Sequence, residues 1–354
     1  MRPRSCASFV RASIQAMAGY APGEQLVTGK YIKLNTNENP YPPSPRVDRE
    51  IRAALDGGLQ RYPDPSASAF RERAAEVLGV DPEAILCGNG SDDILTIVTR
   101  ALVGEGQWVR YPRPSYLLYR TLAEIQGARW QEIPFQPDWS LPEDFAAPAE
   151  GLRLAYLASP NSPSGTVIPP QRVAEIAERL PCPLLVDEAY VDFAEQNCLP
   201  LLAQSDKIMI SRSLSKSYAL AGLRFGFLVA HPALIEQLKK VKDSYNCDRL
   251  AIAGAVAAMD DQAWRAENRA RILATRERAT GKLRELGFSV VPSQANFLWC
   301  THPRQPARKI HDRLRDQRIL VRYMDYPGWG DGLRISVGTD EQMEACFAVL
   351  ETML

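Results

Sequence analysis

Short apolar runs alternate with helical patterns through the middle of the chain. These runs cover residues 108–111, 129–133, 154–158, 184–186, 208–210 and 225–229. Runs without polar alternation are typical of strands that are buried on both faces of a sheet. Strands that alternate with helices form a mainly parallel sheet. The pattern therefore predicts an α/β fold whose large domain has a mostly parallel central sheet.

The pattern changes in the C-terminal third. A long helix is expected over 264–286, and the segments after it read as four strands (288–291, 296–300, 319–322, 333–337) and two helices (306–317, 340–354). The region after Pro232 also reads as the start of a long helical stretch. Such a mixture is typical of an α+β unit.

At the other end, Asn and Pro are frequent between residues 35 and 43, which favours an extended arm over a helix. We therefore expect three parts: an arm (1–45) that packs with the small domain, a large α/β domain (46–245) and a small α+β domain (246–354).

Composition excludes several classes of protein. The 354 residues are 45% hydrophobic, enough for a large core, and 42 basic residues balance 42 acidic ones. A net charge of zero argues against a general electrostatic grip on nucleic acid or on an anionic membrane. Seven scattered cysteines without a C-x-x-C spacing, and three distant histidines, predict reduced thiols and no metal site. With no signal-peptide block and no apolar stretch near the ~20 residues of a membrane span, we expect a cytoplasmic protein.

Lys216 stands out because of its surroundings. It follows the apolar run 208–210, and no acidic residue occurs between Asp206 and Glu236. A lysine without a nearby counter-ion has a destabilised ammonium, which favours covalent chemistry on carbonyl groups. Taken alone, the segment favours the simpler interpretation, an ordinary lysine in a surface loop.

Polar residues also follow two other predicted strands. Asn161 comes after 154–158, and Asp187 and Tyr190 come after 184–186. Ligands gather at the carboxyl ends of strands in α/β sheets. A buried Asp187 needs a cationic partner, whereas the simpler alternative makes it the cap of the next helix. The three strand ends together favour a binding site.

A glycine turn follows the strand expected at 84–87. Gly88, Gly90, Ser91 and Asp92 lie between this strand and a helix over 94–103. A strand, a glycine turn and a helix N-terminus together present free N–H groups to a phosphate. Asp93 stands where the dinucleotide fingerprint requires its third glycine. For the motif by itself, a plain strand–turn–helix linker is the commoner explanation.

The segment SLSKSYALAGLRFG (213–226) resembles the lysine segment of fold-type I pyridoxal-phosphate enzymes, and within them the histidinol-phosphate aminotransferases. The resemblance extends over nearly the whole chain and is carried by the motifs NENP (37–40), RYPD (61–64), GNGSD (88–92), SPNSPSG (159–165), DEAY (187–190), SLSK (213–216) and LRISVG (333–338). It implies a fold-type I transferase with pyridoxal 5'-phosphate as cofactor. The implied reaction exchanges an amino group between L-histidinol phosphate and 2-oxoglutarate in histidine biosynthesis.

The resemblance also assigns roles to residues. Lys216, Asp187 and Tyr190 are the implied catalytic residues: Lys216 holds the cofactor aldehyde and then moves a proton, and Asp187 pairs with the ring nitrogen. Tyr116 is expected to stack on the ring, and Asn161 and Tyr190 to reach its phenolic oxygen. The cofactor phosphate is assigned to seven residues: Gly90, Ser91, Asp92, Ser213, Ser215, Arg224 and, from a neighbouring subunit, Tyr62.

Substrate contacts and assembly are implied in the same way. Arg334 is expected to clamp a carboxylate, with Tyr20, Asn37 and Arg322 near the rest of the substrate. Since Tyr62 is expected to cross a subunit boundary, the protein should be a homodimer with shared active sites. The segment 323–332, which contains Trp329, lies between the two arginines and is expected to shape the substrate pocket.

Three alternatives share this scaffold. An aromatic amino-acid aminotransferase and a phosphothreonine decarboxylase would use the same cofactor residues and differ in the substrate pocket. A regulatory protein would need a DNA-binding module, for which residues 1–45 are too short and too rich in Pro and Asn.

Overall fold

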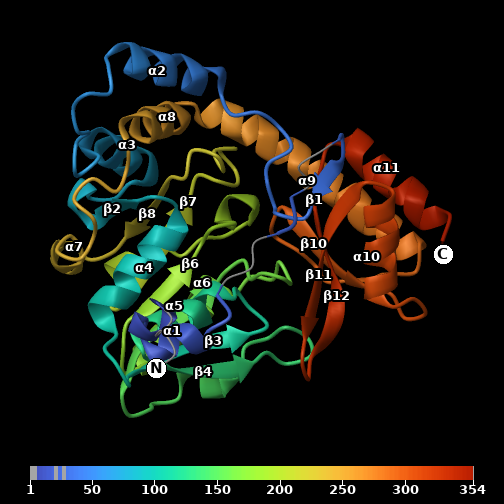
Figure 1. The fold of residues 1–354 in the computed structure, drawn as a ribbon, viewed down its shortest axis with the longest axis horizontal. Coiled ribbons are helices and arrows are strands. Elements are labelled where there is room, and N and C mark those ends of the chain that lie inside the picture. Colours follow the sequence, from blue (N-terminus) through green and yellow to red (C-terminus); the bar gives the residue numbers. More distant parts are fainter. Residues whose placement is uncertain (1–5, 20–22, 26–28, 354) are drawn as a thin grey trace.

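The computed structural model describes residues 6–19, 23–25 and 29–353, which form two sheets flanked by helices (Figure 1). The larger sheet has seven strands in the order β2-β8-β7-β6-β5-β3-β4. Their bounds are β2 (Ile85–Gly88), β3 (Trp108–Arg113), β4 (Arg129–Pro134), β5 (Leu152–Ala158), β6 (Leu184–Asp187), β7 (Ile208–Ser213) and β8 (Gly226–Val229). Neighbouring strands are parallel except β8, which is antiparallel to both β2 and β7. The predicted mostly parallel α/β sheet is therefore confirmed.

Both faces of this sheet are covered, as the continuous apolar runs require. Alternate residues of β6 enter different cores: Leu184 and Val186 pack on the side of α6 (Pro170–Arg179), whereas Leu185 packs on the opposite side. We call these the α6-side core and the α4-side core. The α4-side core is covered by α4 (Ser91–Leu102), α5 (Leu118–Gln126) and α7 (Pro232–Leu238). Helices α2 (Pro45–Asp56), α3 (Ser68–Leu78) and α8 (Arg249–Asp260) pack together beside β2 and β8.

The smaller sheet has five strands in the order β1-β11-β12-β10-β9. These are β1 (Ile32–Leu34), β9 (Ser289–Val290), β10 (Phe297–Thr301), β11 (Ile319–Tyr326) and β12 (Gly330–Ser336). They pack with α9 (Gln262–Glu285), α10 (Ala307–Asp316) and α11 (Asp340–Glu351). Strand β1 of the arm pairs in parallel with β11, with Leu34 opposite Val321, so the arm is part of this sheet. The division into three parts given above stays a prediction.

Some expected elements differ in length. Helix α7 ends at Leu238 rather than continuing past 242, and α8 starts separately because the Asp248 side chain accepts from the N–H groups of Leu250 and Ala251. Strand β11 runs four residues beyond the predicted 322, because it forms a hairpin with β12 up to the pair Tyr326–Gly330. Sequence periodicity missed this extension because its residues are largely polar or half-buried.

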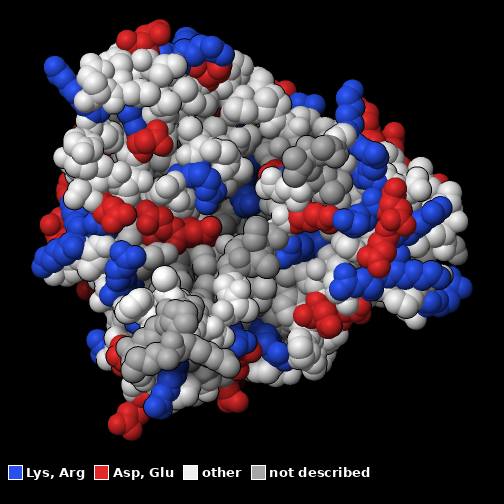
Figure 2. All heavy atoms as spheres, in the orientation of Figure 1, with Lys and Arg blue, Asp and Glu red and all other residues white. Residues whose placement is uncertain are grey.

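The shorter helices occupy the connections. They are α1 (Ala12–Ala16) and the 3-10 helices η1 (Cys6–Phe9), η2 (Pro82–Ala84), η3 (Glu143–Ala146), η4 (Val191–Phe193) and η5 (Leu199–Ala203). Within the described residues, none of the helices has the length and apolar character needed to cross a membrane. Basic and acidic side chains are interspersed over the face shown in Figure 2, as the balanced composition predicts.

Candidate active site

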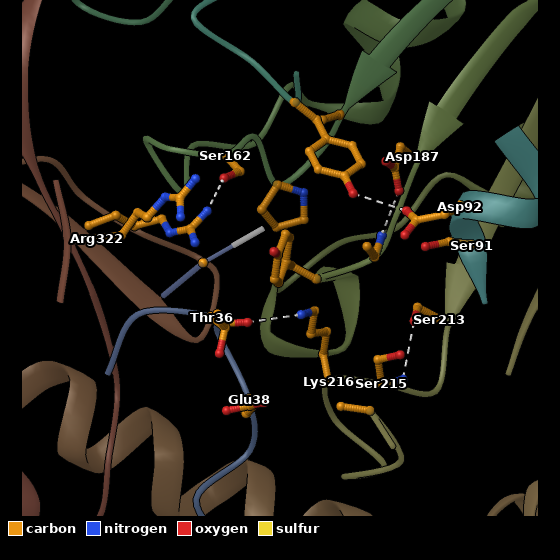
Figure 3. Close-up of a pocket in the computed structure, with 18 of the residues that line it drawn as sticks. Thr36, Glu38, Ser91, Asp92, Ser162, Asp187, Ser213, Ser215, Lys216 and Arg322 are labelled. Atoms are coloured by element: carbon orange, nitrogen blue, oxygen red, sulfur yellow. Dashed lines mark hydrogen bonds between the residues drawn. The ribbon is translucent and has the colours of Figure 1, made fainter. Parts of the chain in front are cut away.

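The carboxyl ends of β6 and β7 open into a cleft of about 290 Å³ that the small sheet borders on its other side. The cleft brings together most of the residues singled out in the sequence. Its lining includes Ser91, Asp92, Tyr116, Asp187, Tyr190, Ser213, Ser215, Lys216, Arg224, Arg322 and Arg334. Figure 3 shows Asp187, Asp92 and Ser91 on one side of this cleft and Arg322 on the other, with Lys216 between them.

Asp187 is a buried carboxylate at the end of β6, with 6% of its surface exposed. Tyr119 donates its hydroxyl to Oδ2 at 2.9 Å, and Ser211 donates its hydroxyl to Oδ1 at 3.2 Å. Burial raises the pKa of Asp187 to about 6, although the Tyr119 hydrogen bond opposes the rise. Among the described residues no Lys, Arg or His lies within ion-pair distance of it. A cationic group that enters the cleft would therefore stabilise the ionised form of this buried carboxylate.

Lys216 lies in the loop after β7, and its Nζ donates to the backbone oxygen of Thr36 at 3.4 Å (Figure 3). The ring centroid of Tyr190 is 5.5 Å from the same Nζ. The arm also fixes the loop, because Asn39 donates its side-chain amide to the backbone oxygens of Lys216 and Ser217 at 3.0 and 3.2 Å. In the described part of the chain, Lys216 forms no ion pair with a carboxylate. Its amine is therefore held in place without a fixed counter-ion.

The N-terminus of α4 forms a close backbone turn beside β8. Gly90, at φ 86°, precedes the helix, and no side chain caps the first turn. A Cβ on Gly226 would lie 2.5 Å from the Ser91 nitrogen, so only glycine permits this approach. Uncapped N–H groups at the N-terminus of a 12-residue helix favour an anion.

Charged and hydroxylated side chains surround that turn. Arg224 places Nη2 3.6 Å from a carboxylate oxygen of Asp92, and it donates from Nη1 to Ser215 Oγ at 3.3 Å. The Ser213 hydroxyl accepts from the Ser215 N–H at 3.1 Å. Tyr116 donates its hydroxyl to Asp92 at 3.0 Å, which holds its ring at the edge of the cleft.

Asn161 is fully buried beside the cleft. Its oxygen accepts from the Ser115 hydroxyl at 2.8 Å, and its amide donates to Pro114 O at 3.1 Å and Ser164 Oγ at 3.0 Å. These bonds fix the turn that connects β5 to the cleft wall. The role in cofactor binding assigned to Asn161 stays a prediction.

Asn37 connects the arm to both sheets. It donates from Nδ2 to the Tyr190 hydroxyl at 3.0 Å, and its backbone N–H donates to Ser336 Oγ at 2.8 Å. The ring of Tyr190 also lies edge-on to Phe297, with centroids 5.0 Å apart. Tyr190 is thereby fixed on both sides.

Arg322 and Arg334 lie directly opposite each other on β11 and β12. Arg334 donates to Ser162 Oγ at 2.9 Å and to the backbone oxygen of Asn35 at 3.0 Å. Its buried Nε has no hydrogen-bond partner among the described residues. A desolvated donor of this kind is stabilised by an incoming anion.

Of the predicted residues that the structure describes, Gly90, Asn37 and Asn161 adjoin lining residues of the cleft without belonging to the lining themselves. Tyr20 lies outside the described residues. Tyr62 is 78% exposed and stacks on Tyr245 with ring centroids 4.4 Å apart, away from the cleft lining. Conversely, the sequence pattern did not single out Tyr119, which lies in the first turn of α5 and meets the ring of Tyr116 edge-on, with centroids 5.7 Å apart. In the described parts of the chain, no group of three or more His, Cys, Asp or Glu could hold a metal ion.

Comparisons with known proteins agree with one another. A sequence profile described as aminotransferase class I and II matches residues 29–350. The chain is 55% identical over 342 residues to a histidinol-phosphate aminotransferase of Rhodopirellula baltica, covering 96% of this chain and 94% of that protein. It is 45% identical over 348 residues to histidinol-phosphate aminotransferase 1 of Trichormus variabilis, covering 98% and 99%.

Among solved structures, it is similar to the histidinol-phosphate aminotransferase of Sinorhizobium meliloti in complex with pyridoxal 5'-phosphate. The TM-score is 0.88 at 28% identity, covering 98% of this chain and 99% of that one. An aromatic aminotransferase from Pyrococcus horikoshii, at 23% identity and a TM-score of 0.79, shows the same fold.

Proposed function

This chain belongs to the aminotransferase class I and II family and is a pyridoxal-phosphate-dependent enzyme, and we propose that it moves the amino group of L-histidinol phosphate to 2-oxoglutarate. One observation carries the proposal. A single cleft holds, at one end, a buried carboxylate and an amine that pairs with no carboxylate of the described residues, and two opposed arginines at the other end. The first pair suits the cofactor, and the second suits substrates that carry a phosphate or a second carboxylate.

The residues present fit the cofactor. Asp187 lacks a cationic partner among the described residues and supplies a negative charge for a protonated ring nitrogen. The uncapped turn at Gly90, Ser91 and Asp92, with Arg224 and Ser215 beside it, suits the phosphate group. Tyr116 would cover the ring, and Asn161, Tyr190, Ser213 and Tyr62 of a neighbouring subunit complete the proposed set. When bound, pyridoxal phosphate supplies an electron sink that stabilises negative charge at the substrate Cα.

Lys216 and Asp187 divide the acid–base work. With pyridoxal phosphate bound, Lys216 would hold the cofactor aldehyde. Once substrate has taken that place, Lys216 Nζ would accept the proton from the substrate Cα and donate it to C4′ of the cofactor. Among the described residues, Lys216 Nζ donates to the backbone oxygen of Thr36 and pairs with no carboxylate, so its movement toward the substrate breaks no ion pair. The ionised Asp187 keeps the ring nitrogen protonated during this transfer. Tyr190, fixed by Asn37, keeps its ring beside the amine.

The arginines decide which substrates are held. Arg334 already donates from its two Nη atoms to Ser162 and Asn35, and its third nitrogen, Nε, is buried without a hydrogen-bond partner among the described residues. A planar guanidinium binds carboxylate and phosphate equally well in two-point geometry. We propose that Arg334 and Arg322 bind the phosphate of histidinol phosphate in one half-reaction. In the other half-reaction they would bind one of the two carboxylates of glutamate. Asn37 and Tyr20 would lie beside the remainder of the substrate.

We also propose a cytoplasmic homodimer. Four large apolar side chains are exposed in α2, in the segment after it and just before α8: Leu55 (50%), Leu59 (57%), Tyr62 (78%) and Tyr245 (45%), of which Tyr62 and Tyr245 stack on each other. A second copy of the chain would cover them and bring Tyr62 to its active site. Mixing inactive Tyr62→Phe and Lys216→Ala protomers tests the shared site, since recovered activity supports it and no recovery contradicts it.

The absorption spectrum of the purified protein tests the reaction. The visible band of the bound cofactor should shift on adding histidinol phosphate and return on adding 2-oxoglutarate. Lys216→Ala serves as control and should not complete this cycle. A band that responds to phenylalanine and not to histidinol phosphate would replace the proposed donor with an aromatic amino acid. Release of CO2 without a keto product would indicate a decarboxylase.

A further inference from the structure

The hairpin of β11 and β12 reaches from the small sheet to the core of the large one (Figure 1). Tyr326, at the end of β11, is 6% exposed and belongs to the α6-side core. Trp329, in the turn after it, packs against the same core, and its ring centroid is 4.9 Å from that of Trp139. Trp139 is itself 8% exposed and lies in the segment that follows β4. The tip of the hairpin therefore packs on the α6-side core through Tyr326 and Trp329, although Pro327, Gly328 and Gly330 of the turn stay exposed.

A hydrogen bond fixes the same tip from β3. Arg113, the last residue of β3, donates from Nη2 to the backbone oxygen of Pro327 at 2.6 Å. Its Nε lies 3.6 Å from Glu132 of β4. Arg113 is thus oriented by the large sheet and holds the backbone of the hairpin turn.

This anchor matters because of what the hairpin carries. Arg322 and Arg334 are cross-strand partners on β11 and β12, four register positions from the pair Tyr326–Gly330. A span of four residues is about 13 Å of strand. By contrast, Lys216 and Asp187 are placed by β6 and β7 of the large sheet. The distance between the two halves of the cleft therefore depends on how the hairpin tip is held.

We propose that Trp329 and Arg113 are positioning residues for substrate binding. They do not line the catalytic end of the cleft; they fix the hairpin so that Arg322 and Arg334 face Lys216 and Asp187 at a constant separation. The inference rests on the proposed function, in which the two arginines bind the anionic groups of the substrates. It assigns a role to the tryptophan that the sequence pattern singled out.

The test compares Trp329→Ala with Trp329→Phe and Trp108→Ala. Trp108 packs against the same core at the amino end of β3, away from the cleft, so its removal reports core stability alone. A misplacement of about 1 Å costs up to ~100-fold in substrate use. We expect Trp329→Ala to raise the KM for glutamate roughly tenfold or more, with kcat changed far less and with the absorption band of the bound cofactor intact. Trp329→Phe should restore most of the binding.

A second variant covers the case in which Trp329→Ala does not fold. Arg113→Met keeps an unbranched apolar stem but removes the guanidinium that donates to Pro327, and we expect it to raise the same KM. Glutamate affinity should also be measured by spectral titration of the holoenzyme, which is independent of turnover.

The inference is overturned if Trp329→Ala and Arg113→Met change glutamate affinity no more than Trp108→Ala does, or if they lower kcat and leave KM unchanged. If the wild-type protein uses glutamate as amino donor but does not react with histidinol phosphate, only the proposed donor is refuted. The glutamate KM values of the variants still decide whether Trp329 and Arg113 position the arginines.

Discussion

Asparagine in place of Asp187 is expected to stabilise the cofactor-free protein at pH 8 and not at pH 4. Burial raises the pKa of Asp187 from 3.8 to about 6 in the folded protein. The folded state therefore holds this proton more tightly than the unfolded state, and Asp187 contributes stability below pH 4 that is lost as the pH rises through 6. A difference of about two pKa units corresponds to about 3 kcal/mol at pH 8.

The hydrogen bonds around the carboxylate offset part of this gain. Ser211 and the Ala189 N–H both donate to Oδ1, while Tyr119 donates to Oδ2. An asparagine amide replaces one of the two acceptor oxygens with donors, which costs about 1 kcal/mol. The net expectation is about 2 kcal/mol of added stability at pH 8, a rise in Tm of roughly 3 °C, and a small loss at pH 4.

Thermal unfolding of the cofactor-free protein at the two pH values measures this effect. Glu188→Gln is the matched control, because the adjacent buried carboxylate has a cationic partner, Arg212, at 2.8 Å. Breaking a buried pair costs about 3–5 kcal/mol, so the control should lose stability where Asp187→Asn gains it. With cofactor bound, Asp187→Asn should lower the amino-transfer rate about 100-fold or more, because the ring nitrogen loses its anionic partner. A Tm that falls at pH 8, or that rises equally at both pH values, would refute the reasoning.

Two further predictions concern the ends of the cleft. Arg334→Lys removes the planar guanidinium that donates to both Ser162 and Asn35. In steady-state kinetics it should raise the KM for glutamate roughly tenfold, with a smaller change in kcat. The control in the same assay is Arg278→Lys, on the surface beside Asp340, which should leave both constants unchanged. Gly226→Ala brings a methyl group to 2.5 Å from the Ser91 nitrogen and 3.0 Å from the Arg212 oxygen. It should lower the free energy of unfolding by about 1–3 kcal/mol, measured from the Tm, and weaken the binding of the cofactor, measured by titration. Gly222→Ala, where a Cβ meets nothing within 4 Å, should do neither, and equal effects of the two alanines would contradict the close-approach argument.

The sequence determined the strands of the large sheet and the residues at their carboxyl ends. A short continuous apolar run is enough to identify a strand that is buried on both faces of a sheet. Asp187, Asn161 and Lys216 each follow such a run, so the local pattern was enough to place them after the strand ends. The glycine turn before α4 was equally local, because a strand, a turn and a helix start are each specified by neighbouring residues. Combined with the resemblance, these positions were enough to predict the fold and the cofactor.

Only the tertiary structure decided how those residues are held. Thr36 accepts from Lys216 across 180 positions of sequence, and Tyr119 reaches Asp187 across 68. The pairing of Arg322 with Arg334, and the contact of Trp329 with Trp139, depend on a hairpin register and on the packing of two sheets. Helical and strand periodicities report which face of an element is buried, but they do not report which distant side chain lies against it. That information exists only once both sheets have packed.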